Sequence, residues 1–211
     1  MFFSLSILLN IFSFAIKSGS DNVIVKMVLL QATEIKYNSN PTIENLYALC
    51  DNLQLSKEYE KIIKYYPQLL ESQELSAYIE NVCGDIKTQN QCYDLFLINY
   101  LISETMMDNF DAELFVVNLR KHKSEEFYNK MLIYAILQFD KDTESLYLFN
   151  SKLDIITEYL TDDEKVFILT MQSNIYDELG NVSLSDKKMD EAYSIQDRQS
   201  GDGSMIDTEN S

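Results

Sequence analysis

Apolar residues recur along this chain at intervals of three and four, the spacing that places them on one face of an α-helix. One such face contains Leu146, Phe149, Leu153, Ile156 and Leu160. The same spacing predicts ten helices, at 23–36, 42–53, 56–71, 73–88, 91–103, 110–121, 124–139, 142–159, 162–179 and 183–196. Because the connections between them are short, we expect consecutive helices to be antiparallel neighbours.

The predicted helix at 124–139 carries apolar residues on two sides. One side has Phe127, Met131, Tyr134 and Ala135, and another has Leu132, Ile136 and Phe139. A helix with two apolar faces needs neighbours on both sides, as in stacked helix pairs that bury their surfaces against one another. We therefore expect an all-α fold, a TPR-like antiparallel helix-pair solenoid over residues 23–196.

Polar residues and proline mark helix boundaries. Thr161-Asp-Asp-Glu164 has the order of a capping box, which gives its acids a structural role at the positive end of a helix rather than a catalytic one. Asn40-Pro-Thr-Ile-Glu44 and Ser56 mark two earlier starts. Pro67 falls inside a helical pattern and predicts a kink or a break there.

The clearest repeat signal lies near the carboxyl end and resembles a tetratricopeptide unit. Small Ser173 and Ser185 would let two helices approach, and Tyr176 would fill the space between them. Gly180 would turn the chain, and Ala192 would admit the next helix. The pair before it, at 124–159, has the right length without these side chains, so any array is degenerate.

Both ends of the chain differ from this middle part. Residues 1–22 form an apolar leader or a first helix: Phe2 to Ile16 resembles a signal peptide, although no Lys or Arg precedes it. This apolar run is shorter than the ~20 residues that a membrane-spanning helix needs, so a membrane anchor is not expected. Another interpretation is an upstream extension, with the functional chain beginning near Met27. Residues 197–211 are polar and predict a disordered tail.

Composition narrows the classes of partner. The formal net charge is −17, and no basic stripe interrupts it, which argues against nucleic acid. An acidic surface favours solubility and basic protein partners, but charge alone selects none. The three cysteines, Cys50, Cys83 and Cys92, form no C-x-x-C pair and fit reduced core thiols, as in a cytoplasmic or nuclear protein.

A search for chemistry yields no catalytic, cofactor-binding or metal-binding residue. The only histidine, His122, has no partner at catalytic or metal-ligand spacing and is interpreted as a solvated cation at a helix end. Asp140-Lys-Asp-Thr-Glu144 begins like a calcium loop, but Ser145 stands where glycine is required and Ser151 where glutamate is required. We expect this segment to cap the following helix, and we do not expect an enzyme.

Three stretches carry a family resemblance. They are Asn45-Leu-Tyr-Ala-Leu-Cys50 with Ile62-Ile-Lys-Tyr-Tyr-Pro-Gln-Leu-Leu70, Lys123-Ser-Glu-Glu-Phe127 with Leu132-Ile-Tyr-Ala-Ile-Leu137, and Leu169 to Ser185. In order and length, the helices at 42–196 resemble the amino-terminal solenoid of the sixth non-ATPase subunit family of the 26S proteasome lid. That family continues into a winged-helix PCI domain that docks lid subunits together. Here the sequence departs from the family pattern, and it is interpreted either as a divergent or incomplete member or as a resemblance to the repeat class alone.

The resemblance implies a non-catalytic scaffold in the regulatory particle, with proteasome lid and ATPase subunits as partners in the cytoplasm and nucleus. An alternative hypothesis starts from the leader: a secreted helical-repeat protein that binds extracellular or host protein partners. Asn181-Val-Ser183 would then be a glycosylation acceptor in a turn between helices.

Overall fold

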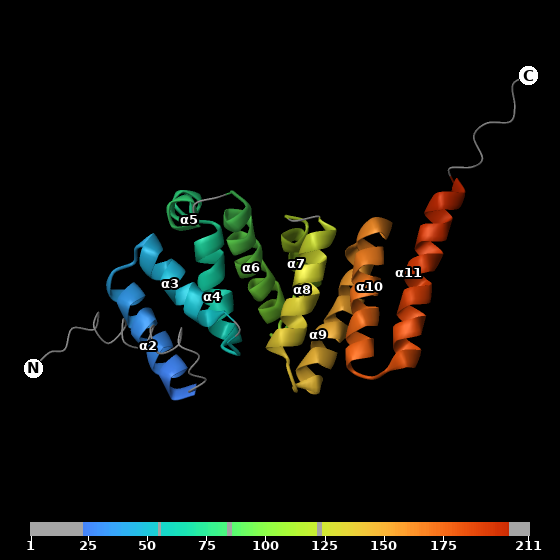
Figure 1. The fold of residues 1–211 in the computed structure, drawn as a ribbon, viewed down its shortest axis with the longest axis horizontal. Helices are drawn as coiled ribbons and strands as arrows, with labels where there is room; N and C mark the ends of the chain where they lie inside the picture. Colours follow the sequence, from blue (N-terminus) through green and yellow to red (C-terminus); the bar gives the residue numbers. More distant parts are fainter. Residues whose placement is uncertain (1–22, 55, 84–85, 122–123, 203–211) are drawn as a thin grey trace, which may run out of the picture. The chain divides into compact units, whose positions relative to one another are not determined.

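The computed structural model describes residues 23–54, 56–83, 86–121 and 124–202, and these residues form an all-α protein (Figure 1). Ten α-helices and one short 3-10 helix occur in the part of the chain that is described. The helices are α2 (Val23–Ser39), α3 (Ile43–Leu53), α4 (Tyr59–Leu70), α5 (Leu75–Cys83), α6 (Ile86–Thr105), α7 (Ala112–Leu119), α8 (Glu125–Gln138), α9 (Thr143–Ile156), η1 (Thr157–Tyr159), α10 (Asp162–Glu178) and α11 (Val182–Asp202). The chain divides into two compact units, Met1–Ser103 and Glu104–Ser211. The predicted leader at 1–22 lies outside the described residues.

Each of the ten predicted helices is present, and the differences lie at their ends. The break expected between 88 and 91 was misplaced, because α5 ends at Cys83, just before Gly84, and α6 begins at Ile86. The start expected at Ser56 falls three residues early. Ser56 Oγ accepts a bond from the backbone N–H of Glu58 at 3.4 Å, and the helix begins after it, at Tyr59.

Of the kink or break predicted at Pro67, the break does not occur, because Pro67 lies inside α4. Proline cannot donate to the carbonyl of Ile63, but this loss falls in the final turn of a helix that ends at Leu70. The preceding residue, Tyr66, is fully buried, and its hydroxyl donates to the carbonyl of Cys50 on α3 at 2.8 Å. Packing against α3 holds the helix through the proline.

The first unit is built around α3, which packs on α2, α4 and α5. Its core includes the fully buried side chains Leu49, Leu53, Ile62 and Leu69. A polar network joins α2 to α4: Glu34 accepts bonds from Lys61 Nζ and from the Tyr65 hydroxyl, both at 2.9 Å. These bonds, that from Lys61 foremost, hold the pKa of the Glu34 carboxyl below its usual range.

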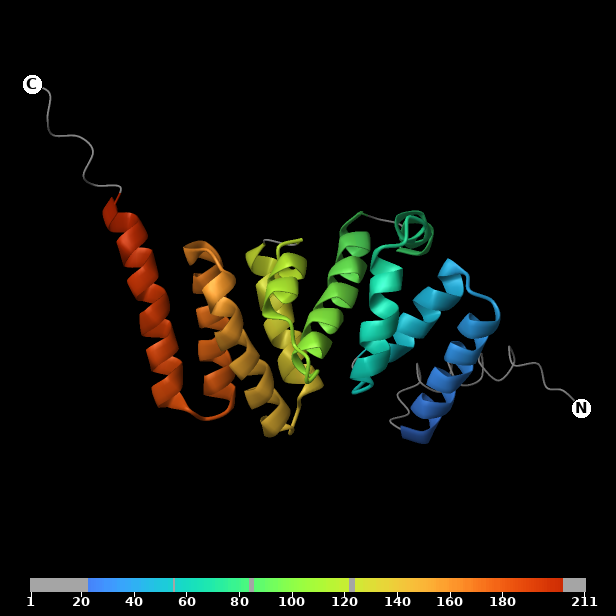
Figure 2. The ribbon, with the colours of Figure 1, turned by 180° about the vertical axis from the view of Figure 1, so that it is seen from behind.

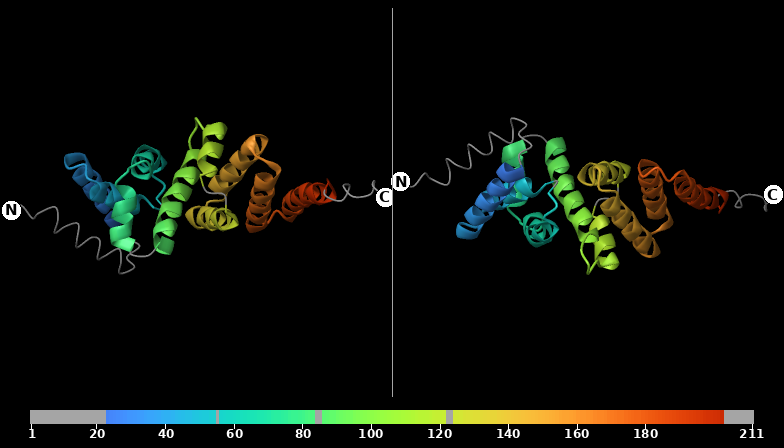
Figure 3. Two further views of the ribbon diagram at one scale, coloured as in Figure 1. Left: turned by 90° about the horizontal axis from the view of Figure 1, so that it is seen from above. Right: turned by 90° about the horizontal axis from the view of Figure 1, so that it is seen from below.

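In the second unit, two pairs of helices pack on each other although another helix lies between them in the sequence. Thus α7 packs on α9 and α8 on α10, which makes two layers (Figure 2). The most extensive packing is between α10 and α11, which lie side by side in both views of Figure 3. Fully buried Phe115, Phe127 and Phe149 lie in the core of this unit.

Helix α11 runs to Asp202, so the disordered tail predicted from 197 begins too early. The prediction ended the helix at its last apolar residues, whereas hydrogen bonding along a helix axis does not require an apolar face. The polar turn is also held locally, since Gln199 Nε2 donates to Asp163 of α10 at 2.7 Å. Residues 203–211 lie outside the described part. Among the helices that are described, none combines the length and apolarity needed to cross a bilayer.

Candidate functional site

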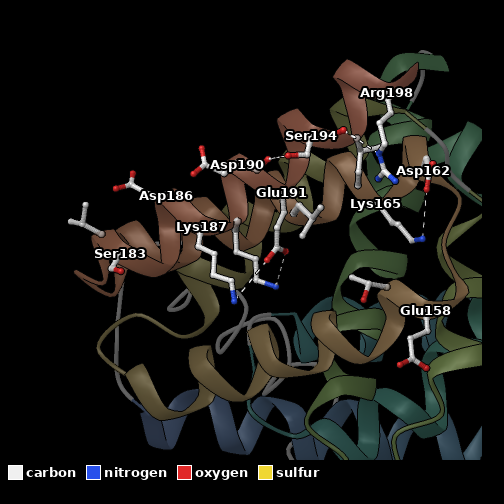
Figure 4. Close-up of a pocket in the computed structure, with 15 residues that line it drawn as sticks. Glu158, Asp162, Lys165, Ser183, Asp186, Lys187, Asp190, Glu191, Ser194 and Arg198 are labelled. Atoms are coloured by element: carbon white, nitrogen blue, oxygen red, sulfur yellow. Dashed lines mark hydrogen bonds and ion pairs between the residues drawn. The ribbon is translucent and has the colours of Figure 1, made fainter. Parts of the chain in front are cut away.

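A groove of about 1210 Å³ opens between η1, α10 and α11 (Figure 4). The groove forms because α11 packs along α10. An ion pair also links α11 to α9, since Lys188 Nζ lies 2.6 Å from Asp154 Oδ1. Leu169 of α10 and Ile195 of α11 lie at its apolar floor and pack with the buried Ala192. The groove is therefore a surface depression with a small apolar base.

Charged side chains of both signs line the groove. The basic ones are Lys165, Lys187, Lys188 and Arg198. Neighbouring acids pair with several of them: Lys165 lies 3.6 Å from Asp162, and Glu191 lies 3.9 Å from Lys187 and 3.8 Å from Lys188. Exposed pairs such as Lys187–Glu191 contribute at most about 1 kcal/mol each, so an incoming partner can exchange them at low cost.

The pairing of α10 with α11 matches the repeat signal in the sequence. Ser173 Oγ and Ser185 Oγ lie 2.9 Å apart in a buried contact, which allows the two helices to approach closely. Gly180 has φ +71°. The N–H of Asn181 donates to Tyr176 and that of Gly180 to Asp177, which together form a Schellman motif.

Tyr176 does more than separate these two helices. Its ring lies 6.4 Å from the ring of Tyr147 on α9. Burial, followed by the nearby Asp154 carboxylate, raises the pKa of the Tyr176 hydroxyl. The predicted wedge therefore contacts the preceding helix.

Behind the groove, α9 and α10 meet through buried polar side chains. Gln172 Nε2 donates to the carbonyl of Asn150 at 3.2 Å and to Asp154 Oδ1 at 2.9 Å. Both amide residues are fully buried, and the amide oxygen of Gln172 has no hydrogen-bond partner among the described residues. Asp154 therefore joins all three helices, since it also holds Lys188 of α11.

One end of the groove is fixed by the start of α10. The predicted capping box is confirmed: Thr161 Oγ1 accepts from the N–H of Glu164, and Glu164 Oε2 accepts from the N–H of Thr161. Glu164 also binds Arg120, with Nε–Oε1 at 3.0 Å and Nη2–Oε2 at 2.9 Å. The Arg120 guanidinium is the main cause that lowers the pKa of this largely buried carboxyl to about 2.

The other candidate chemical residues do not gather at the groove. His122 lies outside the described residues. Asp142 caps α9 as predicted, with Oδ1 accepting from the N–H of Ser145 at 3.2 Å. Cys50 is buried in the first unit, and burial raises the pKa of its thiol. Over the described ranges, no three His, Cys, Asp or Glu side chains are placed to hold a metal ion.

Comparison of the chain with protein-family models, with curated proteins and with solved structures found no match in any of the three.

Proposed function

We propose that this chain is a non-catalytic protein-binding scaffold, built as a TPR-like antiparallel helix-pair solenoid. The observation that carries the proposal is the groove between η1, α10 and α11. It combines an apolar floor at Leu169 and Ile195 with charged walls of both signs, the composition that suits a protein segment. Its lining includes neither histidine nor cysteine, and the acids of the α10 start have structural partners.

The solenoid arrangement is supported by the second unit. The alternation of α7 with α9 and of α8 with α10 is the contact pattern of stacked helix pairs. The Ser173–Ser185 contact and the turn at Gly180 fit one tetratricopeptide-like pair. Each pair buries one face and leaves another for partners.

The resemblance of residues 42–196 to the sixth non-ATPase subunit family makes the proteasome lid the first complex to test. We propose lid and ATPase subunits as partners in the cytoplasm and nucleus. The test is native affinity purification of the full-length chain from its own cells, with mass spectrometry of the co-eluting proteins. Absence of lid and ATPase subunits would remove this assignment.

A groove variant makes the experiment specific. Lys187→Glu with Arg198→Glu reverses two charges in the groove, and Lys26→Glu with Lys36→Glu makes the same change on exposed residues of α2. We expect the first variant to lose partners that the second retains. Equal recovery by both variants would contradict the groove as the binding site.

A second candidate is a secreted helical-repeat protein that binds extracellular or host proteins. Val182 and Ser183 of the Asn181-Val-Ser183 acceptor are exposed in the turn before α11, which favours access by a glycosylating enzyme. Against this, the Asn181 amide oxygen caps α11 by accepting from the N–H of Leu184 at 3.3 Å. A cleaved amino terminus and a glycan on Asn181 in the purified chain would support secretion, and an intact Met1 without glycan would oppose it.

A further inference from the structure

A patch of large apolar side chains remains exposed on the layer formed by α7 and α9. The side chains of this patch are Leu114 (47% exposed) and Val117 (53%) on α7, Leu148 (41%) and Ile155 (47%) on α9, and Tyr159 (46%) on η1. Single exposed apolar residues are common on proteins, whereas a continuous patch marks a binding surface. We call these five residues the α7–α9 patch.

Packing places the two helices that carry the patch beside each other. Leu114 and Val117 are three residues apart, and Leu148 and Ile155 are seven apart, so each pair lies on one side of its helix. Helix α7 packs on both α9 and η1 (Figure 2). Contacts fix both ends: Arg120 Nη2 donates to the carbonyl of Tyr159 at 2.7 Å, and Lys152 Nζ lies 5.4 Å from the centre of the Phe110 ring just before α7. The two helices that carry the apolar stripes therefore lie alongside each other.

Three exposed acids lie on the elements that carry the patch. Glu113 lies on α7, Glu144 on α9 and Glu158 on η1, and all three are exposed. None of them forms an ion pair with another residue in the described ranges. Of the lysines on these elements, Lys152 is half-buried against the Phe110 ring, and Lys121 is exposed just after the end of α7. A partner can thus meet an apolar centre and an acidic rim together.

We propose that the α7–α9 patch binds an amphipathic helix of a partner protein, with an apolar stripe and basic flanks. A helix fits because α7 and α9 offer two packed helices and no strand edge, so a partner must dock through side chains. Basic flanks fit because they pair with the acidic rim. A second copy of this chain is disfavoured, since it brings the same rim and a net charge of −17. This surface adjoins the groove at η1, where Glu158 borders both, and the inference goes beyond the proposed function.

The test uses three labelled peptides of about 18 residues and the full-length chain, with binding measured by fluorescence anisotropy. The first peptide is helical with leucines at i, i+3, i+4 and i+7 and lysines on its flanks. The second has glutamate in place of lysine, and the third is a scrambled form of the first without an apolar stripe. We expect only the first to bind, with an affinity that falls as salt screens the acidic rim.

Variants then locate the site. Val117→Asp with Ile155→Asp is expected to weaken binding of the first peptide at least about tenfold, equivalent to 1.4 kcal/mol. Ile133→Asp with Leu137→Asp makes the same change at two exposed apolar residues of α8, away from the patch and the groove, and is expected to leave binding intact. Far-UV circular dichroism checks that both variants are folded. Equal binding of the scrambled peptide, or equal loss in both variants, would overturn the proposal.

Discussion

The ion pair between Arg120 and Glu164 gives a quantitative prediction about acid stability. We propose the substitution Glu164→Gln, which keeps the side-chain shape and removes the charge. A lowering of the carboxyl pKa from 4.5 to about 2 corresponds to about 3 kcal/mol at neutral pH, at 1.36 kcal/mol per pH unit. Because 37% of the Arg120 side chain is exposed to solvent, screening reduces the expected loss to about 2 kcal/mol.

The pH dependence identifies the origin of this loss. The folded pKa lies below the unfolded one, so the stabilisation is present above pH 4.5 and disappears as the pH falls towards 2. At pH 3, about two fifths of it remains. The difference in unfolding free energy between the native chain and Glu164→Gln should therefore shrink between pH 7 and pH 3.

Urea unfolding followed by circular dichroism at both pH values measures this difference. The matched control is Glu126→Gln on α8, whose carboxylate is 71% exposed and lies 3.0 Å from Lys130. We expect the control to change stability by less than about 0.5 kcal/mol. A loss for Glu164→Gln that is no larger than the control, or that is the same at pH 3 and pH 7, would refute the reasoning.

Two further predictions concern the α10–α11 pair. Ser173→Ala leaves the buried Ser185 hydroxyl without its 2.9 Å partner, which should lower the free energy of unfolding by about 1–2 kcal/mol. The double variant Ser173→Ala with Ser185→Ala should lose less stability than the sum of the two single changes, and additive losses in urea unfolding would contradict this. Gly180→Ala places a Cβ at φ +71° with no atom within 4 Å, so backbone strain alone should lower stability by about 1 kcal/mol; an unchanged thermal midpoint would argue against the left-handed turn.

Local signals were sufficient for the elements that depend on nearby residues. The capping box at Thr161 and the cap at Asp142 each involve residues only three apart. Gly180 likewise ends α10 through bonds to the turn before it. The apolar spacing predicted the all-α class for the same reason, because each helix satisfies its own backbone.

Contacts between distant residues account for what the sequence did not predict. Pro67 remains helical because Tyr66 is anchored to Cys50, sixteen residues earlier. Arg120 and Glu164 are forty-four residues apart, and nothing in the capping-box pattern indicates a second partner for that carboxylate. The groove depends on how α11 lies relative to η1, a property of packing rather than of either segment.

The amide of Gln172 has a consequence for how the helices of the second unit can slide. It donates to two positions on α9, Asn150 and Asp154, that are one helical turn apart. Apolar side chains tolerate small axial shifts, but a shift of α9 by even half a turn would separate both acceptors from this buried donor. The apolar core therefore sets how tightly α9 and α10 pack, while the two hydrogen bonds of Gln172 fix the axial position of one helix relative to the other.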